Sequence, residues 1–353
     1  MKTLFFVIGT RPEAIKLCPL ILKIQKSGKF SVRTVFTGQH AELVKEVMNF
    51  FGIIGDYDFG IMKSGQSLSS IGESLLPAFE KLFLHERCEA VIVQGDTSSA
   101  FFAALSAFYH KIKVIHVEAG LRTHDIYSPF PEELNRRMIA NIACMHFAPD
   151  KYAEKNLKNE GITSSVYVVG NTVTDAISYT LDDNYKNVYT QKKTVMVTLH
   201  RRENHGEIMK GILSGIRTCA IMLSDFDFIF PVHPSPYILE TAKELLSCEK
   251  NIILTSPMCM YDFHNLLYRC ECVISDSGGV QEEASAMGIP IIVPRENTER
   301  TAQQKSGGLY LSGIDGKEIS KIFKKIISGN KKKFVRPQTH VSEKIIRIIE
   351  REL

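Results

Sequence analysis

Short apolar segments rich in β-branched and aromatic residues alternate with helical stretches along the whole chain. In the first half they occupy 3–8, 32–37, 90–95, 113–118, 145–150 and 166–170, and in the second half 194–200, 226–233, 251–256, 272–277, 289–294 and 308–313. Each segment is continuously apolar rather than alternately polar, which is typical of parallel strands covered by helices on both faces. Each half is therefore predicted to form a doubly wound α/β unit of the Rossmann type.

A polar stretch without a predicted strand, residues 181–193, marks the expected domain boundary. A chain of 353 residues favours two domains over one. We expect one domain over 1–180 and a second over 181–336. A C-terminal helix over 337–353 could pack on either domain, and we expect it to return to the first. Two such domains facing each other would form a central cleft, a common ligand site.

The composition is that of an ordinary soluble protein, with 44% hydrophobic residues and a net charge of +4. This charge is too weak to indicate a nucleic-acid partner, although it suits a small anionic substrate. No segment approaches the ~20 apolar residues of a membrane span, and the first apolar run is too short for a signal peptide. The eight cysteines contain no CxxC pair, and Cys270 and Cys272 are most simply core residues. We therefore expect no metal site and a cytoplasmic location.

The segment "GTRPEAIK" (9–16) directly follows the first predicted strand. Gly9 permits a tight turn, Pro12 suits the first turn of a helix, and Arg11 and Lys16 bring positive charge to this end. One interpretation is a loop that contacts phosphate. The alternative is an ordinary helix start with solvated basic side chains.

Three carboxylates come after neighbouring strands of the first half: Asp96, Glu118 and Glu132. Asp96 could simply cap a helix, and Glu132 could simply complement a helix dipole. Because parallel strands end at one edge of a sheet, the three together predict an acid–base constellation. Arginines that could keep a carboxylate ionised lie in the same segments: Arg122, Arg136 and Arg137.

The second half presents cationic groups at its strand ends. "TLHRREN" (198–204) places His200, Arg201 and Arg202 in one loop, and "PVHPSP" (231–236) adds His233. A lone loop histidine is more often structural than catalytic. A cluster of three cationic or protonatable groups needs a counter-charge, which an anionic ligand could supply. The segment 296–308, after the predicted strand at 289–294, adds a Glu-Arg pair.

The segment "SDSGGVQEEASAMGIP" (275–290) reads as the end of a strand, two glycines and a short helix. Glycine lets a ligand approach the main chain, and free N–H groups at a helix start favour an anion. A glutamate one turn further into the helix would suit sugar hydroxyls rather than phosphate. A nucleoside diphosphate carries both an anionic diphosphate and sugar hydroxyls, so it would suit both parts of this segment. No GxGxxG, Walker loop, nucleophile elbow or HExxH is present, which disfavours nicotinamide, P-loop and common hydrolase functions.

Together with "TGQH" (37–40), these segments run in order from residue 7 to about 310 and resemble the non-hydrolysing UDP-N-acetylglucosamine 2-epimerases. The resemblance implies two Rossmann-like domains in a glycosyltransferase-B-like architecture. It also implies a UDP-sugar substrate, neither a cofactor nor a metal, no membrane or nucleic-acid partner, and a homodimer.

The resemblance also implies roles for individual residues. Asp96, Glu118 and Glu132 would act as base and acid on the two faces of the sugar C2, with His200 near the diphosphate or carrying a proton. The residues implied in binding UDP are Arg11, Lys16, Arg136, Arg201, His233, Ser277, Gly278, Gly279 and Glu283. Of these, Ser277 and the two glycines would contact the diphosphate and Glu283 the ribose, while Arg11 and Lys16 would approach from the other domain.

The implied reaction is the reversible C2 epimerisation of UDP-N-acetylglucosamine to UDP-N-acetylmannosamine, by elimination of UDP to a 2-acetamidoglucal and re-addition. It would supply cell-surface polysaccharide synthesis. Two alternatives stay open: a 6-deoxy or uronic acid UDP-N-acetylhexosamine as substrate, and a glycosyltransferase of the same fold, which would not need the three carboxylates. Ala41 and Gly65 depart from the family pattern near a second, activating UDP-N-acetylglucosamine site, so this regulation is not predicted here.

Overall fold

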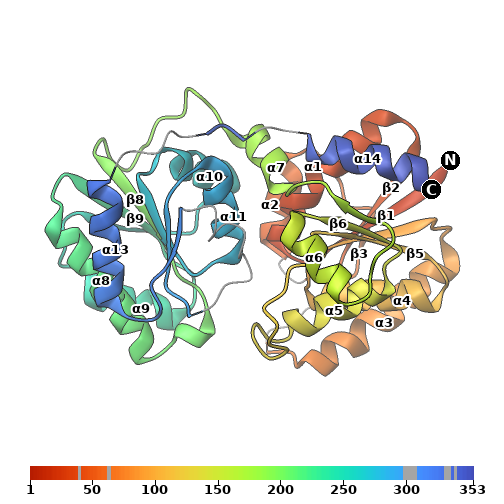
Figure 1. Ribbon diagram of the computed structural model, residues 1–353, viewed down its shortest axis with the longest axis horizontal. Coiled ribbons are helices and arrows are strands. Elements are labelled where there is room, and N and C mark those ends of the chain that lie inside the picture. The colour runs from red at the N-terminus through yellow and green to blue at the C-terminus, as the bar shows by residue number, and fades with distance from the viewer. Residues whose placement is uncertain (39–40, 62–64, 297–307, 330–334, 338–339) are drawn as a thin grey trace. The chain divides into compact units, whose positions relative to one another are not determined.

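The computed structural model describes residues 1–38, 41–61, 65–296, 308–329, 335–337 and 340–353 (Figure 1). The chain divides into two compact units. Unit 1 comprises Met1–Ala176 with Gln338–Leu353, and unit 2 comprises Ile177–Pro337. Among the described residues, no helix combines the length and apolar character that crossing a membrane requires.

Unit 1 contains a seven-stranded parallel sheet in the order β3-β2-β1-β4-β5-β6-β7. Its strands are β1 (Lys2–Ile8), β2 (Phe30–Phe36), β3 (Tyr57–Asp58), β4 (Ala90–Gln94), β5 (Lys113–Val117), β6 (Met145–Ala148) and β7 (Val166–Val168). The strand order reverses between β1 and β4. In open α/β sheets, ligands bind outside the carboxyl ends of the strands at such a reversal.

Helices cover both faces of this sheet: α1 (Arg11–Ser27), α2 (Ala41–Phe50), α3 (Leu68–His85), α4 (Ser98–Tyr109), α5 (Glu132–Ile142), α6 (Lys151–Asn159), α7 (Val173–Thr180) and α14 (Val341–Glu352). The apolar sides of α3, α4 and α5 share one core with Phe5 and Val7. Figure 1 shows α1 and α14 on the opposite face. The C-terminal helix is attached there because the buried carboxylate of Asp175 accepts hydrogen bonds from the main-chain N–H groups of His340 (3.0 Å) and Ser342 (2.6 Å).

Unit 2 contains a six-stranded parallel sheet in the order β10-β9-β8-β11-β12-β13. Its strands are β8 (Lys193–Thr198), β9 (Phe226–Pro231), β10 (Ile252–Thr255), β11 (Cys272–Ser275), β12 (Ile291–Val293) and β13 (Leu309–Leu311). Here the order reverses between β8 and β11, which brings the loops after these two strands together.

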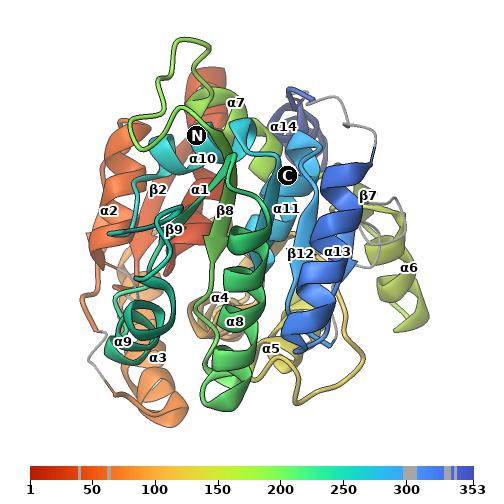
Figure 2. The same ribbon diagram turned by 90° about the vertical axis from the view of Figure 1, so that its left-hand side faces the viewer.

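The helices of unit 2 are the 3₁₀ turn η1 (Arg202–Asn204), α8 (Glu207–Met222), α9 (Pro236–Leu246), α10 (Met260–Arg269), α11 (Gly278–Met287) and α13 (Gly316–Ser328). Side chains of α8, α9 and α13 form the main core with the sheet, and α10 and α11 cover the other face. Figure 2 shows α8 and α13 side by side. Their approach requires glycine, because a Cβ on Gly215 would lie 2.4 Å from the carbonyl oxygen of Gly316.

The predicted fold class is confirmed, since every predicted apolar segment contains a strand of one of the two parallel sheets. The two-residue strand β3 was not predicted because it is too short to leave a hydrophobic pattern. The division between the units falls inside α7, a few residues before the boundary expected at residue 180. Thr180 already belongs to unit 2, because it hydrogen bonds to His264 (2.7 Å) and its carbonyl accepts from Asn265 Nδ2 (2.7 Å).

Candidate active site

In unit 1, the loop after β1 is fixed by the buried carboxylate of Glu13. It accepts hydrogen bonds from the main-chain N–H groups of Gly9 (2.8 Å) and Thr10 (2.6 Å), and from the hydroxyl of Thr97 (2.7 Å) in the loop after β4. Burial raises the pKa of Glu13 and outweighs these hydrogen bonds. Gly9 is not among the residues with a left-handed backbone. It is needed because a Cβ there would lie 2.4 Å from the hydroxyl of Ser99.

Lys16 and Glu118 form an ion pair, with side chains only 5% and 8% exposed. Glu118 follows β5 and has a left-handed backbone (φ 66°), which is uncommon for a residue with a side chain and is often found at functional sites. Lys16, predicted to contact UDP, thus lies directly beside a predicted catalytic carboxylate. Arg11 begins α1 in the same loop and is half-buried.

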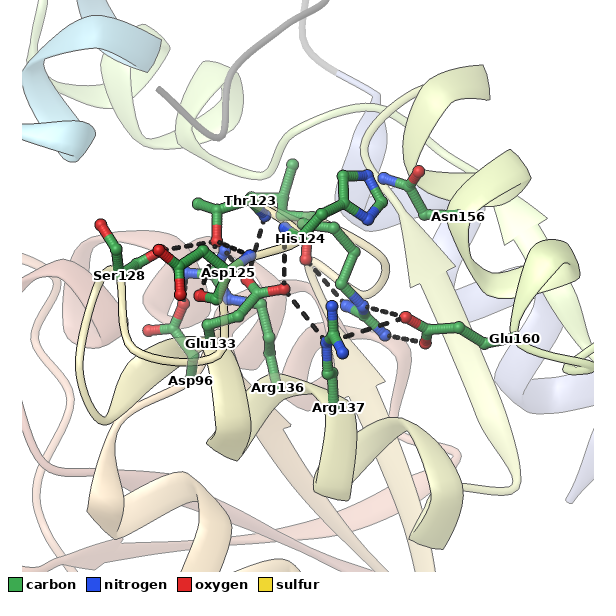
Figure 3. Close-up of polar contacts among 12 residues, drawn as sticks. Asp96, Thr123, His124, Asp125, Ser128, Glu133, Arg136, Arg137, Asn156 and Glu160 are labelled. Carbon is green, nitrogen blue, oxygen red and sulfur yellow. Dashed lines mark hydrogen bonds and ion pairs between the residues drawn. The ribbon is translucent and has the colours of Figure 1, made fainter. Parts of the chain in front are cut away.

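Asp96 pairs with Arg136, which is 4% exposed (Figure 3). Asn135 supports the same loop, since its Nδ2 donates to the carbonyl of Asp96 (2.9 Å). Burial alone would lower the pKa of Arg136, but the charges of Asp96, Glu133 and Glu118 outweigh it and raise that pKa. Asp96 is not the helix cap, because Thr97 caps α4 by accepting from the main-chain N–H of Ala100 (3.0 Å).

The structure therefore brings Asp96 and Glu118 into the field of one cation, Arg136. Glu132 is the first residue of α5, one turn before Arg136 on the same helix, and is half-buried. The predicted carboxylates and Arg136 thus come from the loops after β4 and β5 and from the start of α5. A carboxylate held in place by a buried cation is positioned as a group that transfers a proton must be.

Glu133 holds the irregular loop that precedes α5. Its carboxylate is fully buried and accepts from the main-chain N–H groups of Thr123 (3.1 Å) and His124 (3.3 Å) and from Arg137 Nε (3.2 Å) (Figure 3). The hydroxyl of Thr123 in turn donates to the carbonyl of Ser128 (2.6 Å). Glu133 therefore holds this loop in place, a role that the sequence did not reveal.

Arg122 has a different partner from the one expected. Its guanidinium donates two parallel hydrogen bonds to the carboxylate of Glu160, the residue that follows the C-terminal end of α6 (2.8 and 2.7 Å). Burial would raise the pKa of Glu160, but Arg122 and Arg137 outweigh it and lower that pKa. Within the described contacts, only Arg136 of the three arginines pairs with a predicted catalytic carboxylate. Arg122 and Arg137 instead hold Glu160 and Glu133.

Two buried histidines lie side by side on neighbouring strands of unit 1, His116 on β5 and His146 on β6. His116 Nε2 donates to the carbonyl of Gly95 (2.8 Å), directly before Asp96. Burial lowers the pKa of His116 to about 3 and that of His146 to about 4. Both rings are therefore neutral at physiological pH.

In unit 2, Asp276 organises the loop after β8. This residue follows β11, has no exposed surface, and accepts from His200 Nδ1 (2.9 Å) and from the main-chain N–H groups of His200 and Arg201 (both 3.1 Å). Asn204 Nδ2 donates to its second oxygen (3.0 Å). Burial would raise the pKa of Asp276, but the hydrogen bonds and charge of His200 with the main-chain donors outweigh it and lower that pKa.

The start of α11 is the segment predicted to bind an anion. Ser277 is the N-cap residue, but its hydroxyl makes no cap hydrogen bond, and Gly278 and Gly279 form the first helical positions. A Cβ on Gly279 would meet nothing closer than the Ser277 hydroxyl at 3.9 Å, within the described part of the chain. Packing among the described residues of unit 2 therefore does not require a glycine at this position. A ligand that lies against the main chain would require one.

Glu283 lies one turn inside α11 and is 7% exposed. One carboxylate oxygen is 3.5 Å from His264 Nε2, and the other is buried and accepts no hydrogen bond from the residues that the structure describes. A buried acceptor without a donor is costly, so a hydroxyl group of a ligand would satisfy it.

His233 lies beside His200, with 6.3 Å between ring centroids, at the end of β9. Its Nδ1 accepts from the main-chain N–H of Ser235 (3.2 Å), so Nε2 carries a proton. Arg201 Nε donates to the carbonyl of Asp276 (2.9 Å), which holds its guanidinium against the start of α11. The predicted Glu-Arg pair after β12 lies outside the described residues.

No group of three or more histidine, cysteine, aspartate or glutamate side chains suited to a metal occurs in the described residues. The eight cysteines are all described and none forms a disulfide.

Two parallel α/β units, one with paired carboxylates and one with glycines at a helix start after a strand, are the arrangement of nucleotide-sugar enzymes of the glycosyltransferase-B fold. Residues 22–350 match the family model described as UDP-N-acetylglucosamine 2-epimerase. The UDP-N-acetylglucosamine 2-epimerase of Bacillus subtilis is 40% identical over 327 residues, 91% of this chain and 86% of the relative. The chain therefore belongs to the UDP-N-acetylglucosamine 2-epimerase family.

Solved structures agree with this assignment. The crystal structure of the Neisseria meningitidis UDP-GlcNAc 2-epimerase bound to UDP-GlcNAc has a TM-score of 0.92 at 35% identity, covering 100% of both chains. A spinosyn rhamnosyltransferase, at 14% identity and a TM-score of 0.58, shows only that the fold is shared with glycosyltransferases.

The buried histidines predict a pH dependence of stability. Unfolded histidines bind protons below pH ~6.5, whereas folded His116 and His146 resist protonation until about 3 and about 4. The unfolded state thus binds more protons, and the free energy of unfolding falls by about 1.4 kcal/mol per pH unit per histidine as pH decreases through this window.

Urea unfolding at several pH values between 7.5 and 4.5 measures this slope. His116→Gln keeps a donor for Gly95 but does not titrate, so its slope should be shallower than that of the natural protein. All other titrating groups are common to both proteins and cancel in the difference. Equal slopes would contradict the role of His116.

Proposed function

We propose that this chain catalyses the reversible C2 epimerisation of UDP-N-acetylglucosamine to UDP-N-acetylmannosamine without releasing free sugar. The observation that carries the proposal is the pairing of Asp96 with Arg136 and of Glu118 with Lys16 at neighbouring strand ends of unit 1. A glycosyltransferase of the same fold would not need these carboxylates together. The names of the relatives support the same substrate.

The reaction we propose begins with removal of the C2 proton by a carboxylate as the C1–O bond breaks. A C1=C2 double bond forms, and UDP leaves with the electron pair of the C1–O bond. In the second half, UDP adds back to C1, and a proton is delivered to C2 on the opposite face. The sugar is neither oxidised nor reduced overall, so the chemistry calls for no redox cofactor.

In this scheme Asp96, Glu118 and Glu132 supply the base and the acid, since two faces of C2 must be served. Arg136 and Lys16 hold two of these carboxylates in place by ion pairs. Groups that are already in position need little reorganisation during the reaction.

Unit 2 would bind the nucleotide. Ser277, Gly278 and Gly279 offer a hydroxyl and helix N–H groups to the diphosphate, and Glu283 offers its buried oxygen to the ribose. Arg201 adds a positive charge near the same helix start, and His200 and His233 add ring N–H donors.

We further propose that the enzyme is cytoplasmic, where its free cysteines stay reduced, and that the product feeds synthesis of a surface polysaccharide such as a capsule.

The proposed reaction is tested with purified protein and UDP-N-acetylglucosamine in heavy water, without added cofactor, followed by proton NMR. UDP-N-acetylmannosamine should form, with deuterium at C2 in both epimers. Free N-acetylmannosamine with UDP would indicate a hydrolysing enzyme instead. UDP binding without exchange at C2 would contradict this substrate and favour a modified UDP-N-acetylhexosamine or a transferase.

Neutralising a paired carboxylate should strongly lower the rate of epimerisation while leaving nucleotide binding largely intact. Asp96→Asn and Glu118→Gln are each expected to lower kcat by about 10²- to 10⁴-fold, because proton transfer at C2 is lost. UDP affinity should change far less, since the UDP-binding helix belongs to unit 2. The matched control is Glu154→Gln, which removes the carboxylate of a surface ion pair with Lys158 in the same unit (2.8 Å). Calorimetric UDP titration and initial rates separate the two effects, and near-normal kcat in both variants would overturn the proposal.

We also propose a homodimer through unit 1. Leu84 at the end of α3 and Phe108 and Tyr109 at the end of α4 are large apolar side chains that are 67%, 57% and 66% exposed. Contact between Phe83 and His110 brings these helix ends together. An exposed apolar patch of this kind is typical of a protein–protein contact.

Phe108→Asp should therefore weaken the dimer, since it places a charge in an apolar contact. Ile54→Asp, at an apolar side chain that is 87% exposed elsewhere on unit 1, is the control and should leave the mass unchanged. Size-exclusion chromatography with light scattering at micromolar concentration reports the mass. A Phe108→Asp protein that stays dimeric would exclude this surface.

A further inference from the structure

Asp276 receives hydrogen bonds only from donor groups of one loop, as far as its described contacts show. His200 Nδ1 and the His200 main-chain N–H approach one oxygen, and the Arg201 main-chain N–H and Asn204 Nδ2 approach the other. The carboxylate is completely buried, and its pKa is low, so it is an ionised acceptor. Such an acceptor fixes the proton of the His200 ring on Nδ1.

The Nε2 edge of the His200 ring faces away from Asp276. The His200 side chain is 44% exposed. A ring held by a carboxylate at Nδ1 is stabilised in its doubly protonated, cationic form, as in other histidine–aspartate pairs. A proton on Nε2 as well would make this edge of the ring a charged hydrogen-bond donor.

Hydrogen-bond donors around the ring are consistent with an anion beside it. His233 lies 6.3 Å away between centroids, and Arg201 is held against the Asp276 carbonyl. The nearby acidic residue Glu203 forms ion pairs with Arg201 (3.3 Å) and Arg295 (3.8 Å). The start of α11 directly follows Asp276 in the chain.

We propose that Asp276 is a positioning residue for the epimerase reaction: it holds His200 as an imidazolium, with Nδ1–H toward Asp276 and Nε2–H toward the departing diphosphate of UDP. The inference rests on the proposed function. When the C1–O bond breaks, the electron pair leaves on a phosphate oxygen, and Nε2–H stabilises that charge by a hydrogen bond. No bond to the ring is made or broken.

A purely structural role, in which Asp276 only ties the loop after β8 to β11, makes different predictions. In Asp276→Asn, the amide oxygen can still accept from the Arg201 main chain and from Asn204. The amide nitrogen then faces His200 Nδ1 and needs an acceptor there, so the ring must be neutral with its proton on Nε2. The His200 main-chain N–H loses its nearer acceptor but can still donate to the retained oxygen, which it already approaches at 3.3 Å, so the loop keeps three main tethers while the positive charge is lost.

The first readout is kinetic. Asp276→Asn and His200→Asn are each expected to lower kcat by about 10²-fold, in the range found for removal of one charge-stabilising donor. Because Asp276 acts through His200, the double variant should lose little more than either single variant. Losses that multiply in the double variant would assign Asp276 a separate, structural role.

The second readout does not depend on activity. Nitrogen-15 NMR of the histidine rings in the UDP complex should show both nitrogens of His200 protonated in the natural protein and only Nε2 in Asp276→Asn. A neutral His200 ring in the natural UDP complex would overturn the inference, even if Asp276→Asn failed to fold. An imidazolium that persists in the variant would overturn it as well.

The matched control is Asp175→Asn, which removes another fully buried carboxylate charge that accepts from the main-chain N–H groups of His340 and Ser342 in unit 1. It should lower the thermal unfolding temperature while leaving kcat within a factor of about three, since surface and distant sites are usually independent. Absence of epimerisation by the natural protein would refute the proposed function, whereas the NMR result would still decide the state of His200.

Discussion

In each unit, one buried carboxylate locks the two loops that meet where the strand order reverses. Glu13 joins the loop after β1 to the loop after β4, and Asp276 joins the loop after β8 to the end of β11. Main-chain N–H groups at these strand ends have no partner in the sheet, and burying them unpaired would be costly. The carboxylates satisfy these donors, and the functional side chains attached to the same loops are fixed as a result.

The cations of the site have a comparable double role. Lys16 and Arg136 are nearly buried, so each needs a counter-charge, and Glu118 and Asp96 provide it. Removing one member of a buried pair leaves an uncompensated charge, which costs about 3–5 kcal/mol. The residues proposed for proton transfer are therefore also part of what stabilises unit 1, and the neutral histidines behind them add a sensitivity to acid. Unit 2 differs at the start of α11, where we propose the anion site. Among the described residues, only the Ser277 hydroxyl comes within 4 Å of a Cβ on Gly279, and one oxygen of Glu283 has no hydrogen-bond donor; a bound ligand would explain both.

Sequence patterns predicted much of this arrangement. Continuous apolar segments are a direct consequence of strands buried on both faces, which is why every predicted segment proved to contain a strand. The ends of parallel strands gather at one edge, so Asp96 and Glu118 were expected near each other, and both act on Arg136. Glu13 and Asp276 were within quoted motifs but were not recognised, because a carboxylate that accepts main-chain hydrogen bonds has no sequence signature. Arg122 was assigned to the wrong partner because Glu160 lies far along the chain and meets it only through the packing of α6.

The sequence by itself determined the two-unit α/β fold, the family and the residue types available at each strand end, because hydrophobic periodicity and local turn chemistry are properties of short segments. Tertiary structure alone decided which charges pair and which nitrogen of His200 carries its fixed proton. It also decided which acceptors stay unpaired. These properties depend on distances of a few ångströms between residues remote in the chain, and on burial, which strengthens each electrostatic interaction by excluding water.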